Sequence, residues 1–208
     1  SSATLLSKYK ETEQQPKREK HVNRIKSNVE NLNLILEDFL SLEKLNAGKL
    51  TMKPSKIELV EYTQDCIEET EGILKKGQTV RFDPNREKHQ VYLDRNMYKN
   101  ILVNLLSNAS KYSGPEAPID VNLKITSTSV ELGVRDHGIG IPKSEQANLF
   151  SRFFRASNAG NIQGTGLGLH IVKSYVDLIG GSIRCESQLD VGTHMKIKIN
   201  LVKRTNEE

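Results

Sequence analysis

The sequence predicts an α+β protein in which an α-helical hairpin precedes a two-layer α/β sandwich. Three observations predict this fold class. Apolar residues recur three and four positions apart through residues 18–47, helical and strand-like segments alternate after residue 57, and a polar stretch rich in Gly and Asn interrupts them at 143–163. A chain of 208 residues is long enough for one ordinary domain and a smaller element.

Residues 1–50 are expected to form the hairpin. We expect residues 1–14 to be helical, residues 15–17 to form a turn that contains Pro16, and a long helix to follow from about residue 18 to residue 47. The long helix carries the apolar seam of a bundle or coiled coil, which consists of Val22, Ile25, Val29, Leu32, Leu36 and Phe39. Because one hairpin cannot bury a core alone, we expect a homodimer that completes a four-helix bundle.

Residues 51–208 are expected to form the second domain. In chain order, its expected elements are a helix at 58–75, strands near 78–82 and 89–93, a helix at 94–112, strands at 119–126 and 129–136, a short helix near 144–149, a helix at 166–179, and strands near 181–187 and 194–201. The strands at 119–126 and 129–136 alternate apolar and polar residues like the two arms of a hairpin. Helices and strands in this order favour a mixed sheet with helices on one side.

The composition excludes several classes of protein. No apolar run approaches the roughly 18 residues that a membrane span needs, and no signal-peptide pattern opens the chain. The net charge of +4 is spread along the chain without interleaved aromatic residues, which argues against nucleic-acid binding. Cys66 and Cys185 are isolated and lack metal-ligand spacing, so we expect reduced thiols in a cytoplasmic protein.

The segment NLLSNASKYS, residues 104–113, ends the helix expected at 94–112. Asn104, Asn108 and Lys111 follow one another at spacings of four and three residues, so they share one helical face. Amide oxygens beside an ammonium group suit Mg²⁺ and phosphate, because Mg²⁺ is a hard cation that takes oxygen ligands. A solvent-exposed polar face is the alternative that this segment alone leaves open.

The segment DHGIGIP, residues 136–142, follows the strand expected at 129–136. Asp136 has the same parity as the apolar residues of that strand, so its carboxylate continues their face. A buried carboxylate needs a hydrogen-bond donor, and the amino group of adenine would be a fitting one. Gly138 and Gly140 would let the backbone approach a flat ring, although a simple turn at the end of a hairpin also explains them.

The segment GTGLGL, residues 164–169, is expected to open the helix at 166–179. Glycines at the start of a helix expose backbone N–H groups where the helix dipole is positive, which suits phosphate. A dinucleotide-binding fingerprint requires a strand directly before the glycines, and here residues 158–163 are a polar loop. Walker A and protein-kinase loop signatures are absent from the sequence.

Taken in order and spacing, Asn108, the turn 136–140 and the segment 164–168 resemble the N, G1 and G2 boxes of sensor histidine kinases. LFSRFF at 149–154 resembles the F box of that family, and residues 24–49 resemble the second helix of its dimerisation domain. The resemblance covers nearly the whole chain. It implies a Bergerat-type ATP-binding fold, with ATP and Mg²⁺ as ligands.

The resemblance also implies roles for individual residues. Asn108 would hold Mg²⁺ with help from Asn104, Lys111 would contact phosphate, Asp136 would bind the adenine amino group, and residues 143–163 would be a flexible lid. The remaining nucleotide-binding residues implied in this way are Tyr112, Gly138, Gly140, Ile141, Arg155, Gly164, Thr165, Gly166, Leu167, Gly168, Leu169 and Thr193.

Two positions depart from the pattern of the family, and a third separates the chain from hydrolytic ATPases. His137 stands where the family usually has Asn, and we interpret it as a solvent-facing turn residue; His194 receives no role. Hydrolytic relatives in the wider ATPase superfamily carry a Glu one turn before the metal-binding Asn, and this sequence has Asn104 there. Without that base, bound ATP should be spared from attack by water.

The phosphoacceptor motif of the family, a His followed by an acidic residue and a Thr-Pro-like run, is absent from the sequence. His21 is the only histidine on the hairpin, and it lacks these neighbours. We therefore expect the acceptor to lie upstream of Ser1, about ten residues or three helical turns away.

The resemblance thus implies the catalytic core of a two-component kinase, which donates the γ-phosphoryl group of ATP to that histidine for relay to a response-regulator receiver domain. A cytoplasmic location is expected, either alone or as the cytoplasmic part of a membrane-bound receptor. An ATP-binding regulatory or dimerisation module without transfer activity is the alternative from a different class. A hydrolytic chaperone-type or topoisomerase-type ATPase is disfavoured by Asn104 and by the hairpin.

Overall fold

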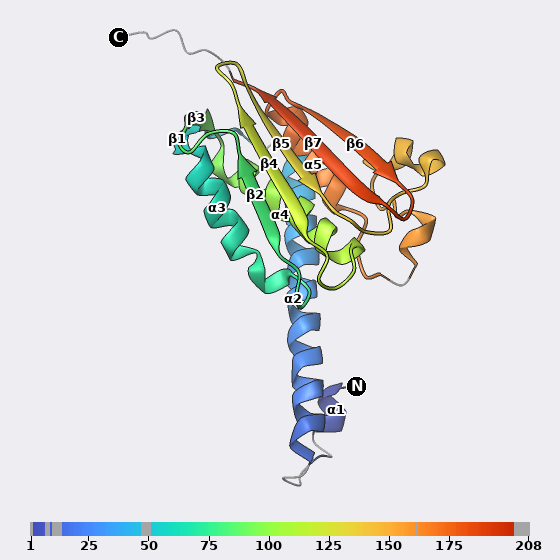
Figure 1. The fold of residues 1–208 in the computed structure, drawn as a ribbon. Helices are drawn as coiled ribbons and strands as arrows, with labels where there is room; N and C mark the ends of the chain where they lie inside the picture. The colour runs from blue at the N-terminus through green and yellow to red at the C-terminus, as the bar shows by residue number, and fades with distance from the viewer. Residues whose placement is uncertain (1, 7–8, 10–13, 47–50, 161, 202–208) are drawn as a thin grey trace. The chain divides into compact units, whose positions relative to one another are not determined.

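The computed structural model describes residues 2–6, 9, 14–46, 51–160 and 162–201 (Figure 1). The chain divides into two compact units, Ser1–Lys49 and Leu50–Glu208. None of the described helices is both long enough and apolar enough to cross a membrane.

The first unit consists of α1 (Ser2–Leu6) and α2 (Gln15–Asn46), which pack against each other. The expected turn at 15–17 is wrong, because α2 already begins at Gln15 and Pro16 lies in its first turn. Proline is tolerated there, since the first N–H groups of a helix have no intrahelical partner. Part of the expected helix at 1–14 lies outside the described residues, namely residues 1, 7–8 and 10–13.

Most of the described side chains of the apolar seam on α2 face solvent in the single chain. Val29 is 49% exposed, Leu32 63% and Leu36 55%, and Val22 is exposed as well. Side chains of this size are rarely left in water along one continuous helical stripe. The apolar seam of α2 therefore exposes hydrophobic side chains that a partner surface could bury.

The second unit is built on a five-stranded sheet in the order β2-β4-β5-β7-β6 (Figure 1). Its strands are β2 (Val80–Pro84), β4 (Ile119–Ile125), β5 (Ser129–Arg135), β6 (Ser182–Gln188) and β7 (Gly192–Asn200). β2 pairs with β4 in parallel, and all other neighbours are antiparallel. The mixed sheet and the hairpin β4–β5 confirm the sequence prediction.

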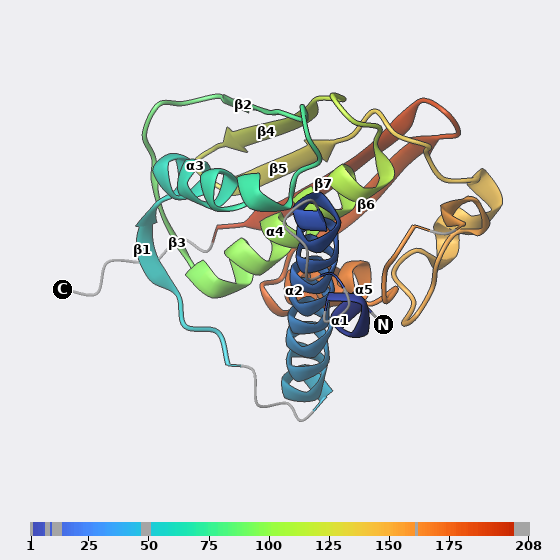
Figure 2. The ribbon, with the colours of Figure 1, turned by 90° about the horizontal axis from the view of Figure 1, so that it is seen from below.

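Helices α3 (Leu59–Glu69), α4 (Arg95–Tyr112) and α5 (Gly168–Leu178) cover one face of this sheet, as Figure 2 shows. Short 3₁₀ turns lie at Glu71–Ile73, Lys143–Asn148 (η3) and Ser157–Ala159 (η4). The two-layer α+β architecture is therefore confirmed. A small two-stranded sheet, in which β1 (Ser55–Glu58) pairs antiparallel with β3 (Gln90–Leu93), was not predicted because β1 has only four residues.

The core lies between the helices and the sheet. On β5 the alternating residues Val130, Leu132 and Val134 are buried, as their spacing predicts. The leucines of α4 that lie between its polar positions are buried too, so the opposite face of α4 carries the N-box side chains. The polar side chains of the predicted N box therefore project from a helix whose opposite face is buried in the core.

Two helices are shorter than the sequence predicted. The helix expected at 58–75 ends at Glu69 and continues as a 3₁₀ turn. The helix expected at 166–179 begins only at Gly168, because Gly166 has a left-handed φ of +72°, which interrupts a right-handed helix. Gly164 and Gly166 consequently belong to the loop before α5.

A buried carboxylate caps α4. The side chain of Asp94 accepts hydrogen bonds from Met97 N at 3.0 Å and from Lys53 N at 2.7 Å. Asp94→Ala should therefore lower the free energy of unfolding by about 1–2 kcal/mol, the usual cost of losing an N-cap. Denaturant titration followed by circular dichroism would measure this loss. Asp94→Asn keeps an acceptor and should lose less; equal loss in both variants would contradict the capping role.

Candidate nucleotide site

The polar face of α4 lies against the N-terminus of α5. A Cβ atom placed on Gly168 would be 2.8 Å from Asn104 Oδ1 and 3.8 Å from Asn108 Nδ2. Asn104 Nδ2 already donates to the carbonyl of Asn100 at 2.9 Å, whereas the amide of Asn108 has no hydrogen-bond partner within the described part of the chain. The structure thus brings the predicted N box to the predicted G2 box and leaves the Asn108 amide available to a ligand.

Lys111 lies one turn beyond Asn108 on α4, and its carbonyl accepts a hydrogen bond from Lys75 Nζ at 2.8 Å. The same ammonium donates to the carbonyl of Ser113 at 2.6 Å. A cation is favourable at the C-terminus of a helix, where the dipole is negative. Lys75 therefore holds the end of α4, and with it the predicted phosphate-contacting residues, in place.

Asp136 directly follows β5, and its backbone N donates to the carbonyl of Thr193 at 2.9 Å. Its Oδ1 accepts hydrogen bonds from Gly138 N at 2.9 Å and from Thr193 N at 3.2 Å. Burial raises the pKa of this carboxyl above its ordinary value, and the two backbone bonds oppose that rise. Since both bonds go to Oδ1, the carboxylate retains an oxygen that can accept from a ligand.

The turn after Asp136 packs closely against two other backbone segments, the end of α4 and the end of β6. A Cβ atom on Gly138 would lie 2.2 Å from the carbonyl oxygen of Tyr112, and one on Gly140 would lie 2.0 Å from that of Gln188. Gly140 also has a φ of +64°, which side chains disfavour. The turn therefore requires glycine at both positions, and it connects the end of α4 to the hairpin β6–β7.

Tyr112 lies where the three predicted boxes meet. Its carbonyl accepts from Ile139 N at 3.1 Å, and its hydroxyl lies 3.9 Å from a Cβ atom placed on Gly164. Burial raises the pKa of the Tyr112 hydroxyl, and the nearby charge of Arg155 opposes this. Arg155 itself donates to the carbonyls of Gly160 and Ile162, so it organises the lid segment.

In the G2 loop, Gly166 passes close to the F-box backbone, because a Cβ atom there would lie 2.7 Å from the carbonyl carbon of Phe153. The hydroxyl of Thr165 accepts from Leu167 N at 3.2 Å, and Leu167 is buried. Only Gly168 and Leu169 of the predicted glycine segment belong to the first turn of α5. The backbone N–H groups of this first turn have no partner within the helix, so they suit the binding of phosphate.

Sequence reasoning missed two polar residues that shape the site. Ser187 Oγ accepts from Ile141 N at 2.9 Å and is 2.9 Å from the hydroxyl of Thr193. Gln146 Nε2 donates to the carbonyls of Ile141 and Ser187 at 3.0 and 2.9 Å. Ser187 and Thr193 are register partners in the hairpin β6–β7, so only the strand pairing identifies their contact.

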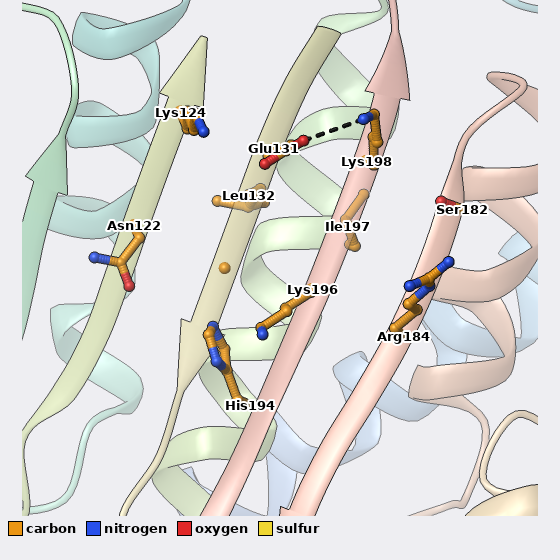
Figure 3. Close-up of a pocket in the computed structure, with 11 residues that line it drawn as sticks. Asn122, Lys124, Glu131, Leu132, Ser182, Arg184, His194, Lys196, Ile197 and Lys198 are labelled. Carbon is orange, nitrogen blue, oxygen red and sulfur yellow. Dashed lines mark ion pairs between the residues drawn. The ribbon is translucent and has the colours of Figure 1, made fainter.

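A hollow of about 560 Å³ lies on the outer face of the sheet and not among these boxes (Figure 3). Its lining includes the ion pair Lys198–Glu131, and the imidazole of His194 extends from β7 over β5. A smaller hollow of about 320 Å³ is lined by Asp136, Ser187 and Thr193 of the candidate site and also by Arg135 and Glu186. Solvated polar faces are usual for an antiparallel sheet, so the hollow of about 560 Å³ does not mark the nucleotide site.

His137 belongs to the same outer surface. Its Nε2 lies 2.9 Å from Asp120 Oδ2, and the side chain is exposed. The imidazole is therefore engaged with a carboxylate on the neighbouring strand β4.

Residues 93–203, more than half of the chain, match the family described as "Histidine kinase-, DNA gyrase B-, and HSP90-like ATPase". The chain belongs to this ATPase family. Relatives that match the chain carry the names of histidine kinases, among them the sensor histidine kinase YvrG of Bacillus subtilis, which is 30% identical over 83% of this chain and 30% of its own length.

One relative, the signal transduction histidine-protein kinase/phosphatase MprB of Mycolicibacterium vanbaalenii, is 35% identical over 79% of this chain and 33% of its own length. The solved mycobacterial sensor histidine kinase MprB is 29% identical with a TM-score of 0.57, over 72% of this chain and 98% of that chain. The histidine kinase AdeS of Acinetobacter baumannii shares the fold at 21% identity and a TM-score of 0.71, covering 97% of this chain and 95% of that one. The chain spans about a third of the length of the curated relatives it matches.

The close approach at Gly140 makes this ATPase domain sensitive to a single methyl group. A residue with a side chain in the left-handed region costs about 1–3 kcal/mol by itself. Gly140→Ala should lower the free energy of unfolding by at least this amount, because its Cβ atom would also overlap the carbonyl of Gln188. Gly114→Ala is a matched control, since nothing lies within 4 Å of a Cβ atom there. Equal stability of the two variants in urea unfolding would contradict the close packing of Gly140 against the Gln188 backbone.

Proposed function

We propose that this chain is the phosphoryl-donor part of a two-component sensor kinase, which binds ATP with Mg²⁺ and presents the γ-phosphoryl group to a histidine. The observation that carries the proposal is the meeting of three distant segments at one place. Asn104 and Asn108 face Gly168, and Tyr112 accepts a hydrogen bond from the turn after Asp136 and lies beside Gly164. Phosphoryl transfer depends mostly on positioning and charge neutralisation, which such a site supplies.

Asp136 is proposed to bind the amino group of adenine. Its backbone-bound Oδ1 fixes the carboxylate, and the remaining oxygen can accept a hydrogen bond from the base. A ligand donor would also relieve the cost of burying the charge, which is expressed in the raised pKa of this carboxyl.

Asn108 is proposed to hold Mg²⁺ through its amide oxygen. The residue fits this role because its amide makes no hydrogen bond to the described part of the chain and lies beside the start of α5. Among the described residues, no group of three or more His, Cys, Asp and Glu side chains forms a metal cage. Mg²⁺ is commonly bound by few protein ligands together with phosphate and water, and it would neutralise charge on the phosphates.

The same helix explains why the site would spare ATP from hydrolysis. An amide at position 104 cannot remove a proton from water, and its Nδ2 is engaged with the carbonyl of Asn100. This favours transfer to a protein nucleophile over a hydrolytic role. We propose that the nucleophile is a histidine outside residues 1–208, with relay to the aspartate of a response regulator.

Residues 1–50 are proposed to be the dimerisation hairpin and residues 51–208 the catalytic domain. The exposed apolar residues of α2 support the homodimer, because a second copy would remove their surface from water. ATP and response regulators are found in the cytoplasm, so we propose a cytoplasmic location for this part of the protein.

Asp136→Asn tests the adenine assignment. Asn can still accept from Gly138 and Thr193 through its oxygen, but it presents an N–H₂ group to the N–H₂ group of adenine. We expect nucleotide affinity to fall at least about tenfold, since a buried donor is left unpaired, while the free energy of unfolding stays equal or rises because the buried charge is gone. Calorimetric titration with ADP and Mg²⁺, paired with urea unfolding, would measure both.

The control for this titration is Asp120→Asn, which removes a carboxylate from the outer surface beside His137. It should leave ADP binding unchanged. An Asp136→Asn protein that binds ADP as tightly as wild type would refute the adenine assignment, and a wild-type chain that binds no nucleotide would refute the proposed function.

Incubation with ATP labelled at the γ-phosphorus tests the position of the acceptor. We expect the 208-residue chain to bind the nucleotide without acquiring label on any of its five histidines. His21, the one histidine on the hairpin, stacks on Tyr9 with ring centroids 5.7 Å apart, and its Nδ1 is buried. Acid-labile label that disappears in His21→Ala would contradict an acceptor outside these residues.

A further inference from the structure

The lid segment, residues 143–163, carries a short turn, η4, whose side-chain hydrogen bonds reach both the start of the lid and the glycine turn 136–140. Glu145, in the first turn of η3, accepts from the backbone N of Ser157 at 2.8 Å and from its hydroxyl at 2.6 Å. Ala159, at the other end of η4, is buried. The turn is therefore anchored at both of its ends.

Between these anchors, Asn158 reaches the glycine turn that follows Asp136. Its Nδ2 donates to the carbonyl of Gly140 at 2.9 Å and lies 3.5 Å from that of Ile139. The carbonyl of Ile139 also accepts from Asp190 N at 2.9 Å, and Gly140 presses against the hairpin β6–β7. One side chain of the lid thus binds the backbone that shapes the proposed adenine end of the site.

The other end of the same amide is unsatisfied. Asn158 Oδ1 is buried and has no hydrogen-bond partner within the part of the chain that the structure describes. A bond from Nδ2 stabilises the docked turn, and a buried acceptor without a donor offsets that gain. The net contribution of this amide to docking of η4 is therefore smaller than that of a fully satisfied one.

We propose that Asn158 is a positioning residue, whose side-chain amide couples docking of the lid to the glycine turn of the nucleotide site. The inference rests on the proposed function, because its consequence is a change in nucleotide affinity. When the amide is bound to Gly140, the turn and the lid are held together before the nucleotide arrives, so less order has to be created on binding.

Asn158→Asp tests this proposal. The substitution keeps the size of the side chain but replaces the donor with a carboxylate oxygen, which repels the carbonyl of Gly140. Asn148→Asp is the matched control, because it makes the same chemical change on an exposed side chain of η3 that has no side-chain hydrogen bond in the described structure.

Two quantities are measured: the dissociation constant of ADP with Mg²⁺ by calorimetry, and the hydrogen exchange of backbone amides in the nucleotide-free chain. Asn158→Asp should weaken ADP binding about 3- to 10-fold, the range of a net hydrogen-bond contribution, and speed exchange at Ser157 N and Ile141 N. Asn148→Asp should change neither. The midpoint of thermal unfolding should match wild type in both variants, since the core is untouched.

Three outcomes would overturn the proposal. ADP affinity in Asn158→Asp equal to that of Asn148→Asp would show that the amide does not act on the site. Faster exchange confined to the lid, with unchanged exchange at Ile141 N, would show that Asn158 stabilises the lid but does not act on the glycine turn. Glu145→Ala removes the neighbouring anchor of η4 and should weaken ADP binding in the same direction; unchanged binding there would also refute the coupling.

These results are separable from the proposed function. If wild-type protein binds no ADP, the proposed function fails, whereas exchange at Ile141 N still reports whether Asn158 holds the glycine turn. If wild type binds ADP and Asn158→Asp binds equally well, the coupling fails and the proposed function stands.

Discussion

The backbone of the turn 136–140 approaches two other backbones more closely than any side chain would allow. Gly138 lies against the carbonyl of Tyr112 and Gly140 against that of Gln188, at distances that a Cβ atom could not occupy. This double contact ties the end of α4, the end of β5 and the hairpin β6–β7 together. The remaining parts of the site, from the carboxylate of Asp136 to the lid, are positioned relative to it.

Around this turn the polar groups are satisfied by neighbours from distant parts of the chain. The Asp136 carboxylate is held by the backbone of Thr193, and Ile141 N is held by Ser187. Low dielectric strengthens such bonds and makes an unpaired group costly, so the network favours one arrangement of the turn. The lid is different, because Asn158 docks it with one satisfied and one unsatisfied amide atom. The proposed adenine end is therefore held by satisfied hydrogen bonds on several sides, whereas the contact of Asn158 with the turn leaves one buried amide atom unsatisfied.

The sequence predicted the elements well where one physical signal dominates. Period-two alternation predicted β4 and β5, and burial of one face of α4 followed from its leucines. It was wrong about Pro16, which opens α2, and about the start of α5, where the left-handed Gly166 delays the helix to Gly168. Both errors concern boundaries, which depend on single backbone angles. The four-residue strand β1 left no pattern long enough to detect.

By itself, the sequence determined the fold class, the order of the three boxes and the residue types proposed to face a nucleotide, because glycine freedom, strand parity and helical spacing are local properties. Tertiary structure alone decided which groups meet across the chain. Ser187 finds Ile141 through hairpin register, Lys75 caps α4 from another loop, and Asn158 finds Gly140 through the docked lid. These contacts join residues 18 to 46 positions apart, and no local pattern encodes a partner at that separation.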